Sequence, residues 1–184
     1  MATATATGIV RIGAKLYASN PEVVDPEAYI GLFHGWIQGR TLDGLPIDVA
    51  DYAHVPDGPG VMLIGHEADR ALDLGEGRPG ALYQRKRDLA GTLEERLRTV
   101  LGAVQDTARR IEEDPAAAGV RFDRDEVLVR VLDRRLAPNE DATMEALQPA
   151  LEAALAAAFP GREAALDRIE DDPKGPFAVR VRLG

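Results

Sequence analysis

The sequence predicts an α+β fold, in which about six or seven strands form a single mixed, largely antiparallel sheet with three helices packed on it. Strand-like alternation occurs near both ends of the chain, and three segments show the 3.6-residue period of amphipathic helices. Four strand-like segments follow one another in residues 45–87 without an intervening helix, which disfavours a doubly wound parallel sheet. We expect residues 1–8 to be a flexible N-terminus and residues 9–184 to form one domain, because 184 residues with 45% hydrophobic content suit a single core.

A strand and a helix open the predicted domain. In residues 9–18, apolar side chains alternate with more polar ones such as Arg11 and Lys15, which is typical of a strand with one face in water. Asp25 then supplies a helix N-cap and Pro26 a first helical residue. The helix is expected to end at Gly39.

The four central segments predict two antiparallel pairs, each joined by a turn rich in Gly and Pro. We take Val55 to pair with Val61 across the first turn, which sets the register of that hairpin. The segments are residues 45–55 and 61–68, joined by the turn 56–60, and residues 68–74 and 81–87, joined by the turn 75–80.

The second half of the chain predicts two helices and two strands. Thr92 and Glu95 form a capping box at the start of a helix that ends at Asp114-Pro115. A central strand over 126–135, a helix over 143–159 and a closing strand over 177–183 follow. Pro149 lies inside the second helix, which is therefore expected either to kink there or to begin there.

Composition excludes several classes of function. The chain has 31 acidic and 22 basic residues, a net charge of −9 and a pI near 4.9, which argues against a nucleic-acid-binding protein. It has no cysteine, so disulfides, thiolate metal sites and thiol nucleophiles are excluded. No apolar run reaches the roughly 18 residues of a membrane span, and the N-terminus lacks the basic start of a signal peptide. We expect a soluble, cytoplasmic protein.

The residue types most used in catalysis and ligand binding are concentrated in the first half of the chain. Every His, Tyr and Trp lies before residue 84. Trp36 falls on the apolar face of the first helix and is predicted to be a core residue. His34 lies at the boundary of that face and is predicted to be half-buried and hydrogen-bonded to backbone.

The densest segment, residues 47–73, reads IDVADYAHVPDGPGVMLIGHEADRALD. Together with FHGWIQ at 33–38 and LYQRKR at 82–87, it resembles the central portion of a family of short uncharacterised bacterial proteins. The resemblance covers residues 30–90 well and the rest of the chain loosely. It implies no activity, cofactor or catalytic residue.

A metal site is the first local hypothesis for this segment. Its ligands would be His34, His54 and His66, completed by an acidic residue such as Asp51, Asp57, Glu67 or Asp69. No metal-binding motif is present, and the Val55–Val61 register holds His54 and His66 apart by roughly 13 Å at about 3.3 Å per residue. We therefore assign neither a metal nor a cofactor.

Acid/base catalysis is the second hypothesis. In the same register, Asp51 and Glu67 share one face of the hairpin, one diagonal step apart, where each carboxylate shifts the pKa of the other. His66 follows Gly65, and a glycine inside a strand often marks a bulge or a close backbone approach. The candidate catalytic residues are His66, Glu67 and Asp51. The simpler interpretation of the acidic pair is a solvated strand end or an ion pair with an arginine, for which Arg70 and Arg85 are candidates.

Binding of an anion to Arg85, Lys86, Arg87 and Arg78 is the third hypothesis, because the first three form the only run of three basic residues in the chain. The simpler interpretation is an exposed strand end. The candidate ligand-binding residues are His54, Asp57, Asp69, Arg85, Lys86 and Arg87.

These hypotheses define three classes of function. We favour a non-catalytic binding or accessory module that presents residues 47–87 to a protein partner or a small anionic ligand. The alternative is a small enzyme that uses His66, Glu67, Asp51 and His54 as acid/base or metal-binding groups. The third is an oligomeric structural protein that associates through exposed edges at the first and last strands.

Overall fold

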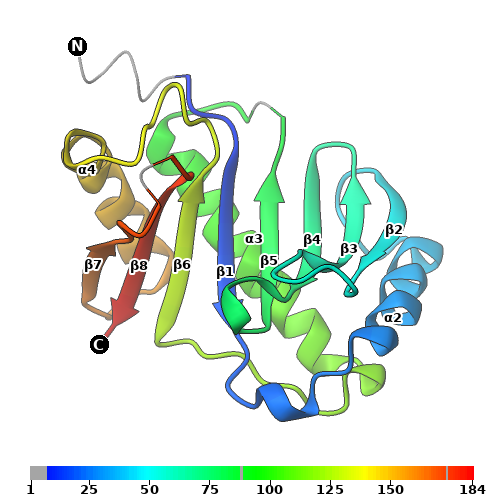
Figure 1. The fold of residues 1–184 in the computed structure, drawn as a ribbon. Helices are drawn as coiled ribbons and strands as arrows, with labels where there is room; N and C mark the ends of the chain where they lie inside the picture. The colour runs from blue at the N-terminus through cyan, green and yellow to red at the C-terminus, as the bar shows by residue number, and fades with distance from the viewer. Residues whose placement is uncertain (1–7, 88, 173) are drawn as a thin grey trace.

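One antiparallel sheet of eight strands, in the order β2-β3-β4-β5-β1-β6-β8-β7, organises the chain in the computed structural model (Figure 1). The structure describes residues 8–87, 89–172 and 174–184, so the predicted flexible N-terminus lies outside the described residues except for Gly8. The strands are β1 (Ile12–Tyr17), β2 (Pro46–Tyr52), β3 (Gly60–Gly65), β4 (Ala68–Asp73), β5 (Gly80–Arg85), β6 (Glu126–Val131), β7 (Ala164–Arg168) and β8 (Phe177–Leu183).

Three α-helices and three short 3-10 helices complete the fold, and the predicted α+β class is confirmed. The α-helices are α2 (Pro26–Gly39), α3 (Leu93–Glu113) and α4 (Asp141–Ala158), and the 3-10 helices are η1 (Pro21–Val23), η2 (Gly75–Gly77) and η3 (Pro115–Ala117). The prediction of six or seven strands is too low because it missed β7. That strand has only five residues, AALDR, and they contain no run of large apolar side chains that would indicate a strand. None of the five is buried.

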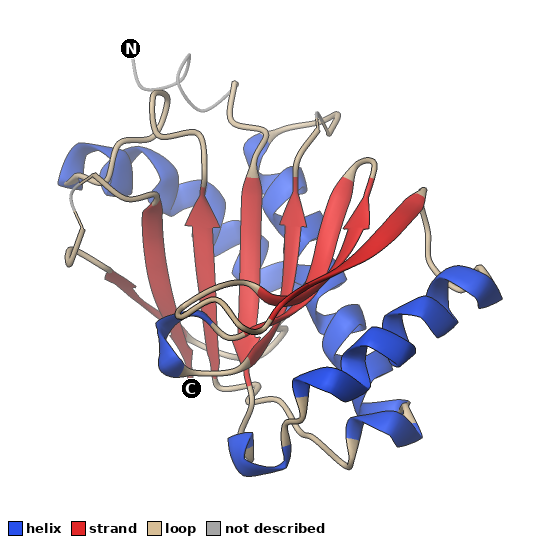
Figure 2. Ribbon diagram, turned by 45° about the vertical axis from the view of Figure 1, so that its right-hand side comes forward, coloured by secondary structure: helices blue, strands red, loops and turns tan. Residues whose placement is uncertain are grey.

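The three α-helices cover one face of the sheet, and the other face carries loops and the short helix η2 (Figures 1 and 2). The covered face and the apolar sides of the helices form one buried core. The sheet contributes to it from several strands, through residues that include Leu63, Tyr83, Ala14, Val129 and Val179. α3 lies along this face and contacts β1, β5 and α4. The opposite face is called the open face below.

The predicted capping box is confirmed at the start of α3. The Glu95 amide donates to the Thr92 hydroxyl at 3.2 Å, and the Thr92 amide donates to Glu95 Oε2 at 2.7 Å. Leu101 and Val104 of this helix are fully buried against the sheet. α4 begins at Asp141 and continues through Pro149, so the predicted alternative start at Pro149 is wrong.

The first strand is central, and its expected wet face and exposed edge are both wrong. β1 pairs with β5 on one side and β6 on the other, and all six of its residues are buried. Lys15, which was predicted to face water, is only 1% exposed, and Tyr17, two residues further along the strand, is 2% exposed. The edges of the sheet are β2 and β7, so an association through the first and last strands has no structural basis here.

The register of the first hairpin also differs from the prediction. Asp51, not Val55, pairs with Val61, and Tyr52 pairs with Gly60. The connection 53–59 takes up more residues than the predicted turn, because it makes two successive turns, in which Val55 N donates to Tyr52 O and Gly58 N donates to Val55 O. The sequence pattern alone did not reveal the first of these turns.

The two predictions for α2 have different outcomes. Trp36 is buried, 7% exposed, and packs edge-on against Phe33 with ring centroids 5.2 Å apart, as a core residue does. His34 is exposed, so its predicted half-burial is wrong.

Among the described residues, no helix is both long enough and apolar enough to cross a membrane.

Asp133 attaches the segment before β1 to the loop that follows β6. Its Oδ2 accepts hydrogen bonds from the amides of Val10 and Arg11 at 2.9 and 2.8 Å, and its Oδ1 accepts one from Arg11 Nε at 2.7 Å. Burial by itself raises the pKa of Asp133, but these hydrogen bonds outweigh burial and hold the pKa below its ordinary value.

We predict that Asp133→Asn lowers the free energy of unfolding by about 1.5–3 kcal/mol at neutral pH, because the amide replaces an ionised acceptor. A carboxylate with a lowered folded-state pKa stabilises the fold above its unfolded pKa of about 3.9 and loses that contribution as the pH falls through the folded value. Urea unfolding at a series of pH values should therefore show the difference from wild type shrinking between about pH 5 and pH 2.

Asp171→Asn is the matched control, because Asp171 is exposed, and it should change stability by less than about 0.5 kcal/mol. A difference between wild type and Asp133→Asn that stays constant down to pH 2 would contradict the assigned role of Asp133.

Candidate functional site

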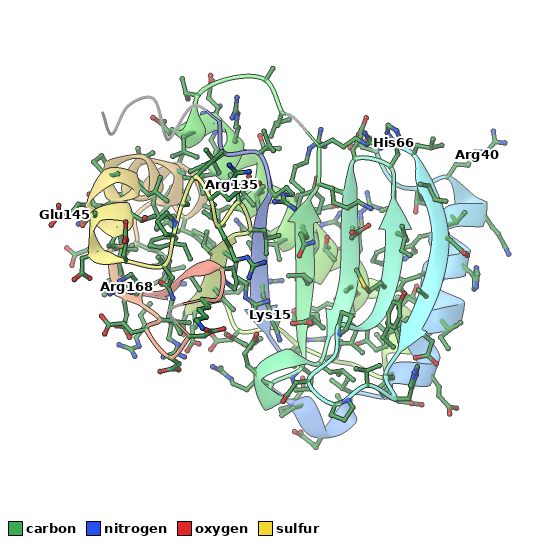
Figure 3. The ribbon with its side chains drawn as sticks, turned by 45° about the horizontal axis from the view of Figure 1, so that its top comes forward. Lys15, Arg40, His66, Arg135, Glu145 and Arg168 are labelled. Atoms are coloured by element: carbon green, nitrogen blue, oxygen red, sulfur yellow. The ribbon has the colours of Figure 1, made fainter. Side chains whose placement is uncertain are left out.

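A pocket of about 240 Å³ lies on the covered side of the sheet, at the end where β3 turns into β4. The loop 42–46 forms one wall and α3 contributes Thr99 and Ala103 to another. The charged and aromatic side chains that line it are Asp43, His66, Glu67, Arg70, Tyr83 and Arg85. Figure 3 shows His66 at this end of the sheet, well away from Lys15 in its centre.

Gly65 sets the shape of the β3–β4 turn. A Cβ at this position would lie 2.3 Å from the Ala68 carbonyl oxygen and 3.5 Å from the Leu45 carbonyl oxygen. The His66 amide donates to that Leu45 oxygen at 2.8 Å, which holds the loop 42–46 against the turn. The predicted close backbone approach at Gly65 is therefore confirmed.

The end of β5 is tied to the same turn. The Lys86 amide donates to the Glu67 carbonyl at 2.9 Å, and Arg87 Nε donates to the His66 carbonyl at 3.0 Å. His66 and Glu67 thus use their backbone to close the turn, which leaves both side chains exposed at the mouth of the pocket. Glu67 Oε2 lies 3.7 Å from Arg85 Nη1, a loose ion pair.

Arg70 lies deeper in the pocket, on β4. Its Nε donates to the Thr107 hydroxyl at 3.2 Å, and its guanidinium carbon lies 5.2 Å from the Tyr83 ring centroid. Burial lowers the pKa of Arg70, and the charges of Asp106 and Asp43 do not offset this effect. An arginine nevertheless remains protonated at any physiological pH.

The Nη atoms of Arg70 are available to a ligand. In the described part of the chain, neither Nη donates a hydrogen bond and no carboxylate oxygen lies within 4.0 Å of the guanidinium. Neither Nη is among the fully buried polar atoms that lack a hydrogen-bond partner, so both are accessible to solvent from the pocket that Arg70 lines. Because a desolvated cation gains most from an anion that it can hydrogen-bond, Arg70 is the side chain here best suited to bind one.

The structure brings together only part of the predicted site. His66, Glu67 and Arg85 line the pocket. Arg87 contacts the β3–β4 turn through the His66 carbonyl. Asp69 and Lys86 instead form an ion pair of 2.7 Å on the open side of the sheet.

Three predicted residues lie at the opposite end of the hairpin. Asp51 pairs with Val61 and accepts the Ala53 amide, while His54 and Asp57 are exposed in the connection 53–59. The predicted pairing of Asp51 with Glu67 is therefore wrong, since it depended on the Val55–Val61 register. The described residues contain no group of three or more His, Asp or Glu side chains placed to hold a metal ion.

Sequence reasoning missed Tyr83 and Thr107, and it considered Arg70 only as an ion-pair partner of Asp51 and Glu67. A signal for Arg70 was present, because in residues 68–73 it occupies the same alternation phase as the buried Leu72. An arginine in the apolar phase of a strand either has a partner or faces a cavity. Thr107 gave no signal, since the helix brings it to Arg70 only in the folded chain.

A second polar cluster lies on the open face around the buried ammonium of Lys15, whose donors all have partners within the protein. The Lys15 ammonium donates to Asp73 Oδ2 at 2.6 Å, to the Gly75 carbonyl at 2.9 Å and to Glu76 Oε2 at 3.1 Å. Arg130 forms an ion pair with the same Glu76. Burial lowers the pKa of Lys15, although Asp73 partly opposes the shift. Because all three donors of the ammonium are used, Lys15 has a structural role and offers no free donor to a ligand.

No protein-family model matches the sequence, and no curated protein sequence is significantly similar to it.

We predict that Gly65→Ala lowers the free energy of unfolding by about 1–3 kcal/mol, because the new methyl group overlaps a backbone oxygen that cannot move without opening the turn. Chemical denaturation measures this loss. Gly35→Ala is the control: a Cβ at this position of α2 would meet no described part of the neighbouring structure within 4 Å, so this variant should be neutral or more stable by about 0.5–1 kcal/mol. Equal effects of the two variants would show that the contact at Gly65 is not restrictive.

Proposed function

We propose that this protein is a non-catalytic binding module, whose 47–87 meander holds a small anionic ligand in the Arg70 pocket. The observation that carries the proposal is the guanidinium of Arg70, which is largely desolvated, has no carboxylate partner among the described residues, and keeps both Nη atoms open to the pocket. A group of this kind binds a carboxylate or phosphate through two parallel hydrogen bonds.

The size of the pocket restricts the ligand. A volume of about 240 Å³ is below the roughly 300–1,000 Å³ of sites for drug-sized ligands. The mouth carries the carboxylates of Glu67 and Asp43 as well as Arg85, and these carboxylates repel an anion. An anion is therefore bound most favourably at the deep position beside Arg70. The ligand class is therefore a small anion with one carboxylate or phosphate group directed at Arg70.

Support for the enzyme alternative is weaker. That alternative uses His66 and Glu67 together with Asp51 and His54, but the latter two lie at the far end of the hairpin. His66 and Glu67 are both exposed at the mouth of the pocket, so the four groups do not come together in one acid/base site.

The proposal predicts that Arg70→Met weakens binding of acetate or inorganic phosphate about 10- to 100-fold, because about 1.5–3 kcal/mol of charge-assisted hydrogen bonding is lost. Binding is measured by titration in ¹H–¹⁵N NMR, in which the Arg70 side chain and the Ala68 amide of wild type should shift. Methionine fills a similar volume and removes a desolvated charge, so circular dichroism should show an intact fold.

Arg182→Met is the matched control, since Arg182 is 61% exposed by side chain and lies on β8, away from the pocket. It should bind like wild type. The proposal fails if the wild-type pocket signals do not move at millimolar anion, or if both variants weaken binding equally.

A further inference from the structure

The open face carries a groove at the same end of the sheet as the Arg70 pocket. Two adjoining hollows of about 550 and 560 Å³ share Arg11, Leu132 and Arg134, so they form one continuous depression. It is bounded by the segment before β1, the end of β5, the loop after β6 and Pro176 before β8. Figure 3 shows Arg135 on this side, above Lys15.

The groove has an excess of positive charge on a chain whose net charge is −9. Its cations are Arg11, Lys86, Arg134 and Arg135. Arg11 is paired with Asp133 at 2.7 Å, and Lys86 with Asp69 at 2.7 Å. Among the described residues, these four cations and their two carboxylate partners leave an excess of two positive charges.

Arg134 and Arg135 supply that excess. Arg134 Nη1 donates to the neutral Lys174 carbonyl at 3.1 Å. Within residues 8–87, 89–172 and 174–184, no carboxylate oxygen lies within 4.0 Å of either guanidinium. Both side chains are exposed, and each therefore has hydrogen-bond donors available to a bound anion.

The loop that presents these two arginines is held in place. The Leu136 and Ala137 amides donate to the Asp133 carbonyl at 2.8 and 2.9 Å, which closes a tight turn around Arg134 and Arg135. The Asp133 side chain is fixed at the same time by the amides of Val10 and Arg11. Little ordering of the backbone is then needed when a ligand binds.

The walls of the groove indicate the kind of ligand. Leu132, Leu136 and Pro176 supply apolar surface, and Leu136 is 37% exposed. None of the described residues that line the groove is aromatic, so a base-stacking platform for a nucleic acid is absent from it. The acidic charge of the whole molecule also repels a long polyanion.

We propose that this groove is a second binding site, separate from the Arg70 pocket, for a small organic phosphate. The phosphate, with a charge of about −1.5 to −2 at neutral pH, matches the excess of two positive charges and the planar donors of Arg134 and Arg135. The organic part packs against Leu136 and Pro176. A volume near 550 Å³ is within the usual range for a small-molecule site.

The test uses phenyl phosphate as the probe, with inorganic phosphate for comparison, in NMR titrations at low salt. Wild type should bind phenyl phosphate more tightly than inorganic phosphate, with shifts of the Arg134 and Arg135 amides. The double variant Arg134→Gln/Arg135→Gln should bind phenyl phosphate at least tenfold more weakly. Raising the salt concentration should weaken wild-type binding.

Two control variants test whether phenyl phosphate binds in the groove and not elsewhere on the protein. Arg40→Gln/Arg98→Gln removes the same charge from two exposed positions in other parts of the fold and should bind like wild type. Arg70→Met should retain binding in the groove, which separates this inference from the proposed function of the pocket. Circular dichroism confirms that each variant is folded.

Several results would overturn the inference. They are no binding of phenyl phosphate by wild type at millimolar concentration, equal weakening by the groove and control variants, and loss of binding in Arg70→Met alone. Tighter binding of a single-stranded oligonucleotide than of phenyl phosphate, lost in the same double variant, would replace the small molecule by a nucleic acid.

Discussion

The ion pair between Lys15 and Asp73 is the constraint on which the open face depends. Lys15 lies on the central strand and is 1% exposed, so its charge must be satisfied within the protein. Asp73 supplies the counter-charge, and the Gly75 carbonyl and Glu76 complete the set, which holds the β4–β5 connection over the sheet. This closes one end of the open face and leaves the other end as the basic groove.

The side chains of β5 and of Lys86, the residue that follows it, alternate between the two surfaces of the sheet. Tyr83 and Arg85 point to the covered side and line the pocket, whereas Gln84 and Lys86 point to the open side and line the groove. Since successive strand residues face opposite sides of a sheet, one short run serves both. A basic run that suggested one anion site therefore belongs to two candidate sites, separated by the sheet.

Much of the fold was predictable from local patterns, and the candidate site was predictable only in part. The Thr92–Glu95 capping box, the β4–β5 pair and the close approach at Gly65 follow from short-range chemistry, and all three are confirmed. The pairing of Asp51 with Glu67 failed because a shift of register moves every cross-strand neighbour at once. The role of Arg70 in the pocket was missed because Tyr83 and Thr107, which it contacts, come from a different strand and from α3.

The sequence by itself determined the α+β class, the order of the main elements and the concentration of His, Tyr and Trp in the first half of the chain. These properties depend on periodicity, caps and turn residues, which act over a few neighbours. Only the tertiary structure decided that β1 is central, that Lys15 is buried and that Arg134 and Lys86 line the same hollow. Those facts depend on strand order and on which face the helices cover, and both are set by packing between segments far apart in the chain.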